Sequence, residues 1–164
     1  MRQFTLVQDM EMDVAEHWRR FFDDAFERAL YLEYMGFLGY ELLETRQTEA
    51  EMTRRVRVVP RLEAPAPVRK ALGSTFAYTE DGTFDRKAQV WRLRMTPSVF
   101  ADRMTSTATV RAEATTPGRC RRTIECRLEA RIFGLGGLIE SALEKNVRSG
   151  WEKSARFMND WVKR

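Results

Sequence analysis

The order of apolar patterns along the chain constrains its fold more than any single motif. From Tyr40 onward the spacing of apolar residues changes from a helical period to alternation, which is typical of strands with one buried face. The alternating residues form three predicted hairpins, over residues 40–59, 74–95 and 102–133. One long helical pattern then covers residues 136–163. Consecutive hairpins favour antiparallel neighbours, and the long helix can cover the apolar face of the sheet that they form.

Glycine residues mark the predicted turns. Asp81 and Gly82 predict the turn of the second hairpin, and Pro117 with Gly118 predicts that of the third. A further cluster, Gly134, Gly136 and Gly137, follows the last strand and could be a phosphate-binding loop or a turn. Because it follows an antiparallel hairpin and lacks the spacing of nucleotide-binding loops, we interpret it as the turn that folds the helix back across the sheet. The alternative is that these glycines make close contact with a bound molecule.

A strand and two short helices are predicted ahead of the hairpins. Residues 4–10 have the composition of a strand. Asp13 can cap a first helix, and Glu16 stands three residues later, as in a capping box. A second helix is predicted over residues 24–34, with Gly36 near its end.

Together these elements predict an α+β fold. A curved, seven-stranded antiparallel sheet would wrap around the long C-terminal helix, with two short helices after the first strand. A chain of 164 residues fits one domain, so residues 1–164 are predicted to form a single ligand-binding unit.

The composition indicates a soluble globular protein with a mildly basic surface. Its hydrophobic fraction of 43% and charged fraction of 32% are ordinary for this class. The net charge of +4 fits either a solvated surface or an anionic partner such as lipid head groups or nucleic acid. Basic residues are interleaved with acidic ones and form no recognition motif, so a nucleic-acid partner is not expected. Neither a secretory signal nor a membrane-spanning segment is recognised, and a cytoplasmic protein is predicted.

Motifs for catalysis or cofactor binding are not found in the sequence. His17 is the single histidine and lies in an amphipathic helix, where a packing or surface role is expected. Cys120 and Cys126 are six residues apart and form neither a zinc motif nor a disulfide framework, so we interpret them as small hydrophobic residues. No metal or cofactor is therefore expected.

The last helix has an apolar stripe whose centre is not bulky. The positions that share one face are Ile139, Leu143, Asn146, Val147, Gly150, Ser154, Phe157, Met158 and Trp161. Gly150 lies near the centre of this stripe, although glycine inside a helix costs about 1 kcal/mol relative to alanine. Gly150 could allow a strand or loop to approach closely. It could also make room for a ligand to which Asn146 offers hydrogen bonds.

The third hairpin also places small residues on its inward face. Met104, Ser106, Ala108, Val110, Ala112 and Ala114 alternate on one strand, and Cys120, Arg122, Ile124, Cys126, Leu128 and Ala130 on the other. A small-residue sheet opposite a helical glycine leaves a void unless larger side chains fill it. Trp91, Leu93 and Met95 could fill part of this space. A cavity is the favoured interpretation, and tight helix packing is the alternative.

Polar residues occur on the same inward faces. Arg54 alternates with Met52 and Val56, Gln89 shares a face with Trp91, and Arg122 shares one with Ile124. A buried arginine must be paired with or bound to an anionic group. Alternatively, each of these side chains lies near a strand end and extends to solvent.

The element order resembles the START-like helix-grip superfamily (SRPBCC). The proline-rich segment before VRKALG is similar to an uncharacterised bacterial START-like family. The segment from Pro65 to Gly73, with Asn146 and Gly150 in the last helix, also resembles PRELI-type phospholipid-transfer proteins, although Ser149 stands where those proteins carry a lysine. The resemblance implies a deep pocket between sheet and helix, a hydrophobic ligand such as an acyl lipid, and a lid formed by residues 60–73.

The sequence therefore predicts non-catalytic binding or transfer of a hydrophobic molecule such as a lipid, with transient contact to a membrane surface. A cyclase or aromatase using an acid or base such as Tyr78 is one alternative, and a module that holds a partner protein in the same groove is another. The predicted ligand-binding residues are Arg54, Gln89, Trp91, Leu93, Met104, Ser106, Ala108, Ala112, Arg122, Ile124, Cys126, Leu143, Asn146, Val147, Gly150 and Phe157.

Overall fold

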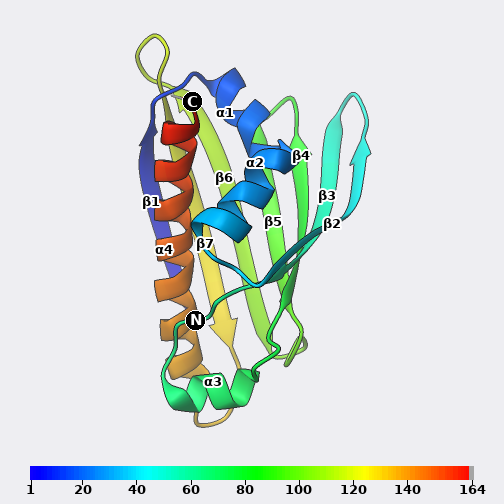
Figure 1. The fold of residues 1–164 in the computed structure, drawn as a ribbon, viewed down its shortest axis with the longest axis vertical. Helices are drawn as coiled ribbons and strands as arrows, with labels where there is room; N and C mark the ends of the chain where they lie inside the picture. The colour runs from blue at the N-terminus through cyan, green and yellow to red at the C-terminus, as the bar shows by residue number, and fades with distance from the viewer. Residues whose placement is uncertain (163–164) are drawn as a thin grey trace.

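One antiparallel sheet of seven strands, in the order β1-β7-β6-β5-β4-β3-β2, forms the body of the molecule (Figure 1). The structure is a computed structural model that describes residues 1–162, so residue 163 of the predicted last helix lies outside the described residues. The strands are β1 (Arg2–Met10), β2 (Gly39–Gln47), β3 (Glu51–Val59), β4 (Tyr78–Asp85), β5 (Val90–Pro97), β6 (Met104–Ala114) and β7 (Cys120–Ala130). Every strand from β2 to β7 neighbours the next in the sequence, while β1 joins the far edge beside β7.

The helices cover one face of this sheet. They are α1 (Val14–Phe21), α2 (Asp24–Arg28), the π-helix η1 (Ala29–Tyr34), α3 (Ala66–Leu72) and α4 (Gly136–Val162). The long helix α4 runs along β1 and β7, while α1, α2 and η1 cross the neighbouring strands on the same side, and α3 lies at one end of the molecule (Figure 1). The predicted helix-grip architecture, with its sheet and long C-terminal helix, is confirmed.

The second short helix differs from its prediction. We expected one helix over residues 24–34, but the backbone widens into a π-helix from Ala29, where the Met35 amide donates to the Leu30 carbonyl at 2.9 Å. Asp13 caps α1 as predicted, because its Oδ1 accepts from the Glu16 amide at 2.8 Å. The Glu16 carboxylate, however, binds Arg19 and Arg20 on the same helix.

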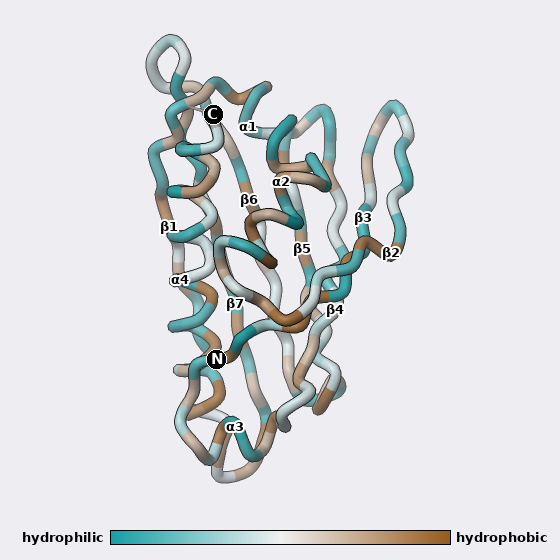
Figure 2. Tube along the Cα trace, viewed as in Figure 1, coloured by the Kyte–Doolittle hydropathy of each residue, from teal (hydrophilic) through white to brown (hydrophobic). Residues whose placement is uncertain are grey.

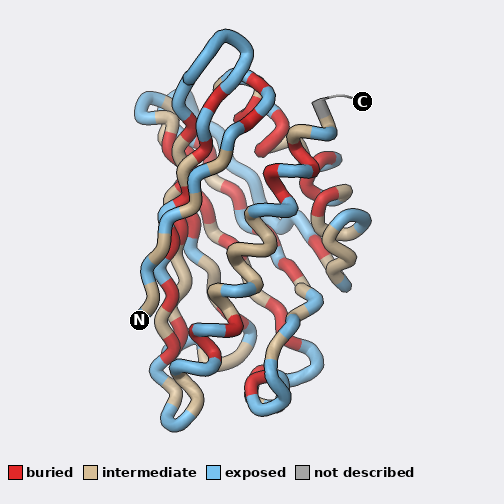
Figure 3. Tube along the Cα trace, turned by 90° about the vertical axis from the view of Figure 1, so that its left-hand side faces the viewer, coloured by how far each residue is buried: buried red, intermediate tan, exposed pale blue. Residues whose placement is uncertain are grey.

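Buried and exposed positions alternate along the strands, as the sequence predicts (Figure 3). On β7 the inward set runs from Cys120 to Ala130 at every second residue, and all six of its members are buried. The β2–β3 hairpin behaves differently at its tip, which is hydrophilic and exposed (Figure 2). The core therefore lies between α4, the short helices and the strands β3 to β7.

The predicted turn at Asp81 and Gly82 is wrong. Both residues lie inside β4, and the chain turns at residues 86–89 instead, where Asp85 accepts a hydrogen bond from the Ala88 amide at 2.9 Å. Gly82 has a packing role, since a Cβ atom there would lie 1.9 Å from the Trp91 ring. Glycine is present here because the Trp91 ring packs against the backbone, and from the sequence alone such a glycine looks the same as one in a turn.

The other glycine predictions agree with the structure. Gly118 turns the β6–β7 hairpin with a φ of 78°, and Gly134 has a φ of 73° between β7 and α4, a conformation that other residues rarely adopt. At Gly136 a Cβ atom would lie 2.4 Å from the Ala130 carbonyl oxygen, so glycine allows α4 to begin close against the sheet. The glycine cluster is the turn that folds α4 back.

None of the helices formed by residues 1–162 combines the length and apolar character needed to cross a membrane.

Candidate functional site

A cavity of about 250 Å³ lies between the sheet and the helices α2, η1 and α4. Strands β3 to β7 contribute its floor, and residues 60–63, which follow β3, line one side. This volume lies just below the ~300–1,000 Å³ that is typical of small-molecule sites. The fold thus leaves a space in its core that is large enough for a compact molecule.

Most of the predicted binding residues line this cavity. They are Arg54, Trp91, Leu93, Met104, Ser106, Ala108, Cys126, Leu143, Asn146, Val147 and Gly150. A Cβ atom added at Gly150 would meet no atom within 4 Å. Gly150 therefore borders open space, and the alternative that it admits a closely packed strand is wrong.

Five predicted residues do not line the cavity. Ala112, Ile124 and Phe157 belong to the packed aromatic core beside Trp18 and Phe26. The helix α1 packs against β6 over that part of the sheet, and the cavity lies beside it, where α2 and η1 line open space. Strand alternation alone could not reveal this division, because it shows which face a residue is on but not what covers it.

The remaining two are Gln89 and Arg122. Gln89 lies in the β4–β5 turn with a φ of 55°, where its Nε2 donates to the Arg86 carbonyl at 2.8 Å. Its predicted place on the inward face depended on the misplaced turn. Arg122 is fully buried, but its guanidinium donates to Gln8 Oε1 at 2.6 and 2.9 Å and lies against the Trp151 ring. Both expectations of a place in the cavity wall are therefore corrected.

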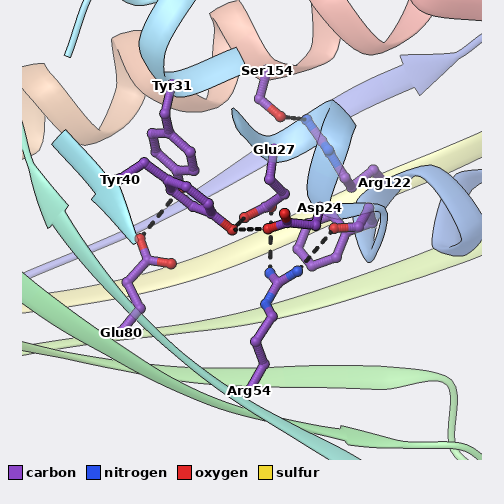
Figure 4. A network of polar contacts seen from close by, with 9 residues as sticks. Asp24, Glu27, Tyr31, Tyr40, Arg54, Glu80, Arg122 and Ser154 are labelled. Carbon is purple, nitrogen blue, oxygen red and sulfur yellow. Dashed lines mark hydrogen bonds and ion pairs between the residues drawn. The ribbon is translucent and has the colours of Figure 1, made fainter. Parts of the chain in front are cut away.

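Arg54 forms a buried ion pair at the edge of the cavity. Its Nη2 lies 3.3 Å from Glu27 Oε1, and its Nη1 donates to the Phe21 carbonyl at 3.3 Å (Figure 4). The guanidinium also lies 5.2 Å from the centroid of the Trp91 ring. Tyr40 donates to the other oxygen of Glu27 at 3.2 Å. The pair is thus hydrogen-bonded on both sides, as a buried ion pair needs to be.

A second carboxylate, Glu80 on β4, faces the same cavity (Figure 4). The Tyr31 hydroxyl donates to Glu80 Oε1 at 3.3 Å. Burial raises the pKa of Glu80 to about 7, and the charge of Glu27 adds to this effect. Burial also raises the pKa of Glu27, against the influence of Arg54. A like-charged neighbour adds to the burial effect in each case, namely Glu27 for Glu80 and Asp24 for Glu27.

Asn146 lines the cavity, but its side chain is hydrogen-bonded to backbone groups of the protein. Its Nδ2 donates to the Glu63 carbonyl and to the Ala142 carbonyl, each at 2.7 Å, and its Oδ1 accepts from the Glu63 amide at 3.2 Å. The side chain thus joins α4 to the segment after β3. The expectation that Asn146 offers hydrogen bonds to a ligand is corrected to a role in holding residues 60–63 over the cavity.

Glu27 and Glu80 are among the cavity residues that the sequence analysis missed. Glu80 alternates with Gly82 and Phe84 on β4, all three of them buried, but the turn predicted at Gly82 interrupted that pattern. Glu27 follows Phe26 and precedes Leu30 by three residues, which places it beside an apolar helix face. Within residues 1–162 no group of three or more potential metal ligands is found.

The sequence of residues 5–162 matches the family model described as "Protein of unknown function (DUF2505)". The chain belongs to the DUF2505 family. No curated protein matches the sequence. The match runs from within β1 to the end of α4 and includes every residue that lines the cavity.

Solved structures similar to this DUF2505 chain share the START-like fold. The ZhuI aromatase/cyclase from Streptomyces sp. R1128 superposes with a TM-score of 0.68 at 14% identity, covering 99% of this chain and 94% of that one. A START superfamily protein from Mycobacterium smegmatis gives 0.59 at 8% identity, with 98% of each chain covered. Norcoclaurine synthase from Thalictrum flavum superposes with a TM-score of 0.64 at 12% identity, covering 98% of this chain and 86% of that one. At these identities the comparison establishes the fold alone.

Proposed function

We propose that this protein binds one hydrophobic molecule in the cavity beneath α4 and acts by holding or transferring it. The observation that carries the proposal is the cavity itself, which lies in the core where close packing is the rule. Its wall includes Trp91, Leu93, Met104 and Val147. Each methylene group that a ligand buries against such a wall contributes about 0.8 kcal/mol.

The size of the cavity favours a single acyl chain or a compact ring system. A volume of about 250 Å³ is small for a site that would enclose a lipid with two chains. Residues 60–63 would form the lid, and the exposed basic residues Arg61, Arg69 and Lys70 in and after this segment would favour brief contact with an anionic membrane surface.

A second candidate function is acid–base catalysis of the cyclase kind. The observation that favours it is Glu80, a buried carboxyl group in a cavity beside Tyr31 and Tyr78. Burial raises the pKa of Tyr78 well above its usual value, so this hydroxyl keeps its proton at neutral pH and is available as a proton donor, not as a phenolate base. Mass spectrometry of polyketide substrates incubated with the protein tests this candidate, which predicts a cyclised product that a Glu80→Gln variant does not form.

Binding can be followed through two cavity tryptophans, Trp91 and Trp151. Titration with 1-octanol should change their fluorescence and saturate at one molecule per chain, as counted by native mass spectrometry. A Gly150→Trp variant should fill the cavity and weaken binding at least ten-fold. Glu152→Trp is the matched control, because Glu152 is an exposed position two residues further along α4. Unchanged binding by a folded Gly150→Trp variant would contradict the proposal.

A further inference from the structure

The charges inside the cavity do not balance. Arg54 is paired with Glu27, whose second oxygen accepts from Tyr40. Glu80 is the additional carboxyl group, and the side chain of this residue is as deeply buried as that pair. Among the described residues, no lysine, arginine or histidine nitrogen lies within 4.0 Å of it. The interior of the cavity therefore carries one more acidic group than basic groups.

Glu80 also retains hydrogen-bonding capacity. Tyr31 donates to its Oε1, and within residues 1–162 no donor reaches its Oε2. An ionised carboxylate in an apolar site is costly unless a partner compensates its charge. The side chain lines the cavity, so a bound molecule can reach the free oxygen.

Aromatic side chains surround this end of the cavity. Tyr31, Phe37 and Tyr78 all line it and pack together on the buried side of β3 and β4. The Tyr31 and Phe37 ring centroids are 5.4 Å apart. Aromatic rings next to a carboxylate form the kind of surroundings in which proteins bind ammonium groups, because the ring faces attract positive charge.

We propose that this end of the cavity binds the ammonium group of a hydrophobic amine, with Glu80 as its counter-ion and the alkyl or ring portion extending along the apolar wall. The inference rests on the proposed function, since it assigns a ligand class to the same cavity. An acidic head group is disfavoured, because an anion here would face Glu27 and Glu80 and could not pair with the already occupied Arg54.

The charged groups at the rim do not alter this preference. Arg61, Glu63, Lys145 and Lys153 line the outer part of the cavity and are all exposed. Charges in contact with water are screened by solvent and salt, whereas those inside an apolar cavity interact strongly. The interior carboxylate therefore decides which head group binds at depth.

The proposal predicts a pH dependence. The groups that face Glu80 are Glu27 on α2, Tyr31 on η1, Arg54 on β3 and Tyr78 on β4, while Met95 opposite it on β5 does not titrate. Both tyrosines keep their protons at neutral pH because burial raises the pKa of each. Amine binding should therefore strengthen as Glu80 ionises around pH 7 and persist until the amine loses its own proton near pH ~10.

The test compares three eight-carbon probes, octylammonium, 1-octanol and octanoate, by tryptophan fluorescence at pH 8 and pH 5.5. At pH 8 octylammonium should bind on the order of ten-fold more tightly than 1-octanol, and octanoate more weakly than either. At pH 5.5 the advantage of the amine should largely disappear. Glu80→Gln should remove the advantage at pH 8, so that octylammonium and 1-octanol bind with similar Kd values. Glu152→Gln is the control, because Glu152 is an exposed carboxylate on α4 outside the cavity wall, and this variant should retain the advantage.

Equal binding of amine and alcohol by the wild type at pH 8, or tighter binding of octanoate, would overturn the inference while leaving the proposed function intact. An amine preference that persists in Glu80→Gln would overturn it as well. If no probe binds, the proposed function fails and the inference fails with it. The pH comparison in the wild type decides the question without the variant, so a Glu80→Gln chain that does not fold does not prevent the test.

Discussion

Two buried arginines on the same face of the sheet have opposite surroundings. Arg54 on β3 pairs with the Glu27 carboxylate and borders the cavity. Arg122 on β7 binds neutral groups only, namely Gln8, the Trp151 carbonyl and Ser154, and the aromatic core packs over its half of the sheet. A buried arginine thus borders a cavity in one region and lies in a packed end of the core in the other.

The two regions differ in what lies over the sheet. Near Arg54 the helices α2 and η1 contribute Glu27 and Tyr31, which bond to Arg54 and Glu80 of the sheet at the cavity (Figure 4). Near Arg122 the helix α4 lies directly against the sheet, and its Trp151 carbonyl and Ser154 hydroxyl accept from the guanidinium. Polar groups from the short helices thus line the cavity in one region, while α4 covers the buried arginine in the other.

The largest effect is expected from breaking the pair in the Arg54 region. Glu27→Leu leaves Arg54 buried without a counter-ion, and the free energy of unfolding should fall by about 3–5 kcal/mol. Urea unfolding measures it. Glu33→Leu on the exposed side of η1 is the control and should change stability by less than about 0.5 kcal/mol. A loss below about 1 kcal/mol in Glu27→Leu would show that the pair contributes little, and the contrast with Arg122 would disappear.

Glu80 should make stability depend on pH. Its folded pKa of about 7 exceeds the ordinary value of 4.5, so the folded chain binds more protons than the unfolded chain between these values. Its stabilising contribution is complete below pH ~4.5 and is lost as the pH rises to about 7, at about 1.4 kcal/mol for each unit that separates the two pKa values. Urea unfolding from pH 4.5 to 8 should show this decline in the wild type relative to Glu80→Gln. Parallel pH profiles of the two proteins would contradict it.

Replacing Arg122 should have a much smaller effect than breaking the Arg54 pair. Burial lowers the pKa of Arg122, which means that its surroundings disfavour the charge. Arg122→Met removes the charge and retains most of the volume, so stability should change by no more than about 1.5 kcal/mol. The same urea experiment checks this, with Arg54→Met as the comparison. A loss as large as that of Glu27→Leu would show that the two arginines are equivalent.

The smallest effect is expected at Gly150. Because a Cβ atom there meets no neighbour, Gly150→Ala should raise the free energy of unfolding by up to about 1 kcal/mol through helix propensity alone. Thermal unfolding measures the change. A destabilised variant would mean that space beside α4 is not free.

The sequence predicted the sheet, the long helix and part of the cavity wall because these follow from periodicity. Alternation placed Arg54 and Cys126 on the inner face correctly. Alternation could not distinguish Ala112 from Ala108, because both lie on the inner face of β6. The packing of α1 decides that Ala112 lies beneath side chains and Ala108 beside the cavity. Glu80 was missed because Gly82 was interpreted as a turn residue, whereas it lies inside β4 beneath the Trp91 ring.

The most direct test of the binding cavity is the affinity of a series of straight-chain alcohols, from 1-hexanol to 1-dodecanol, measured by titration calorimetry. Each methylene buried in the cavity should lower the Kd about four-fold, corresponding to about 0.8 kcal/mol. The gain should stop once the chain fills the cavity, and it should stop at a shorter chain in Gly150→Trp. A Kd that does not change with chain length, or one that falls without limit in both proteins, would contradict the account.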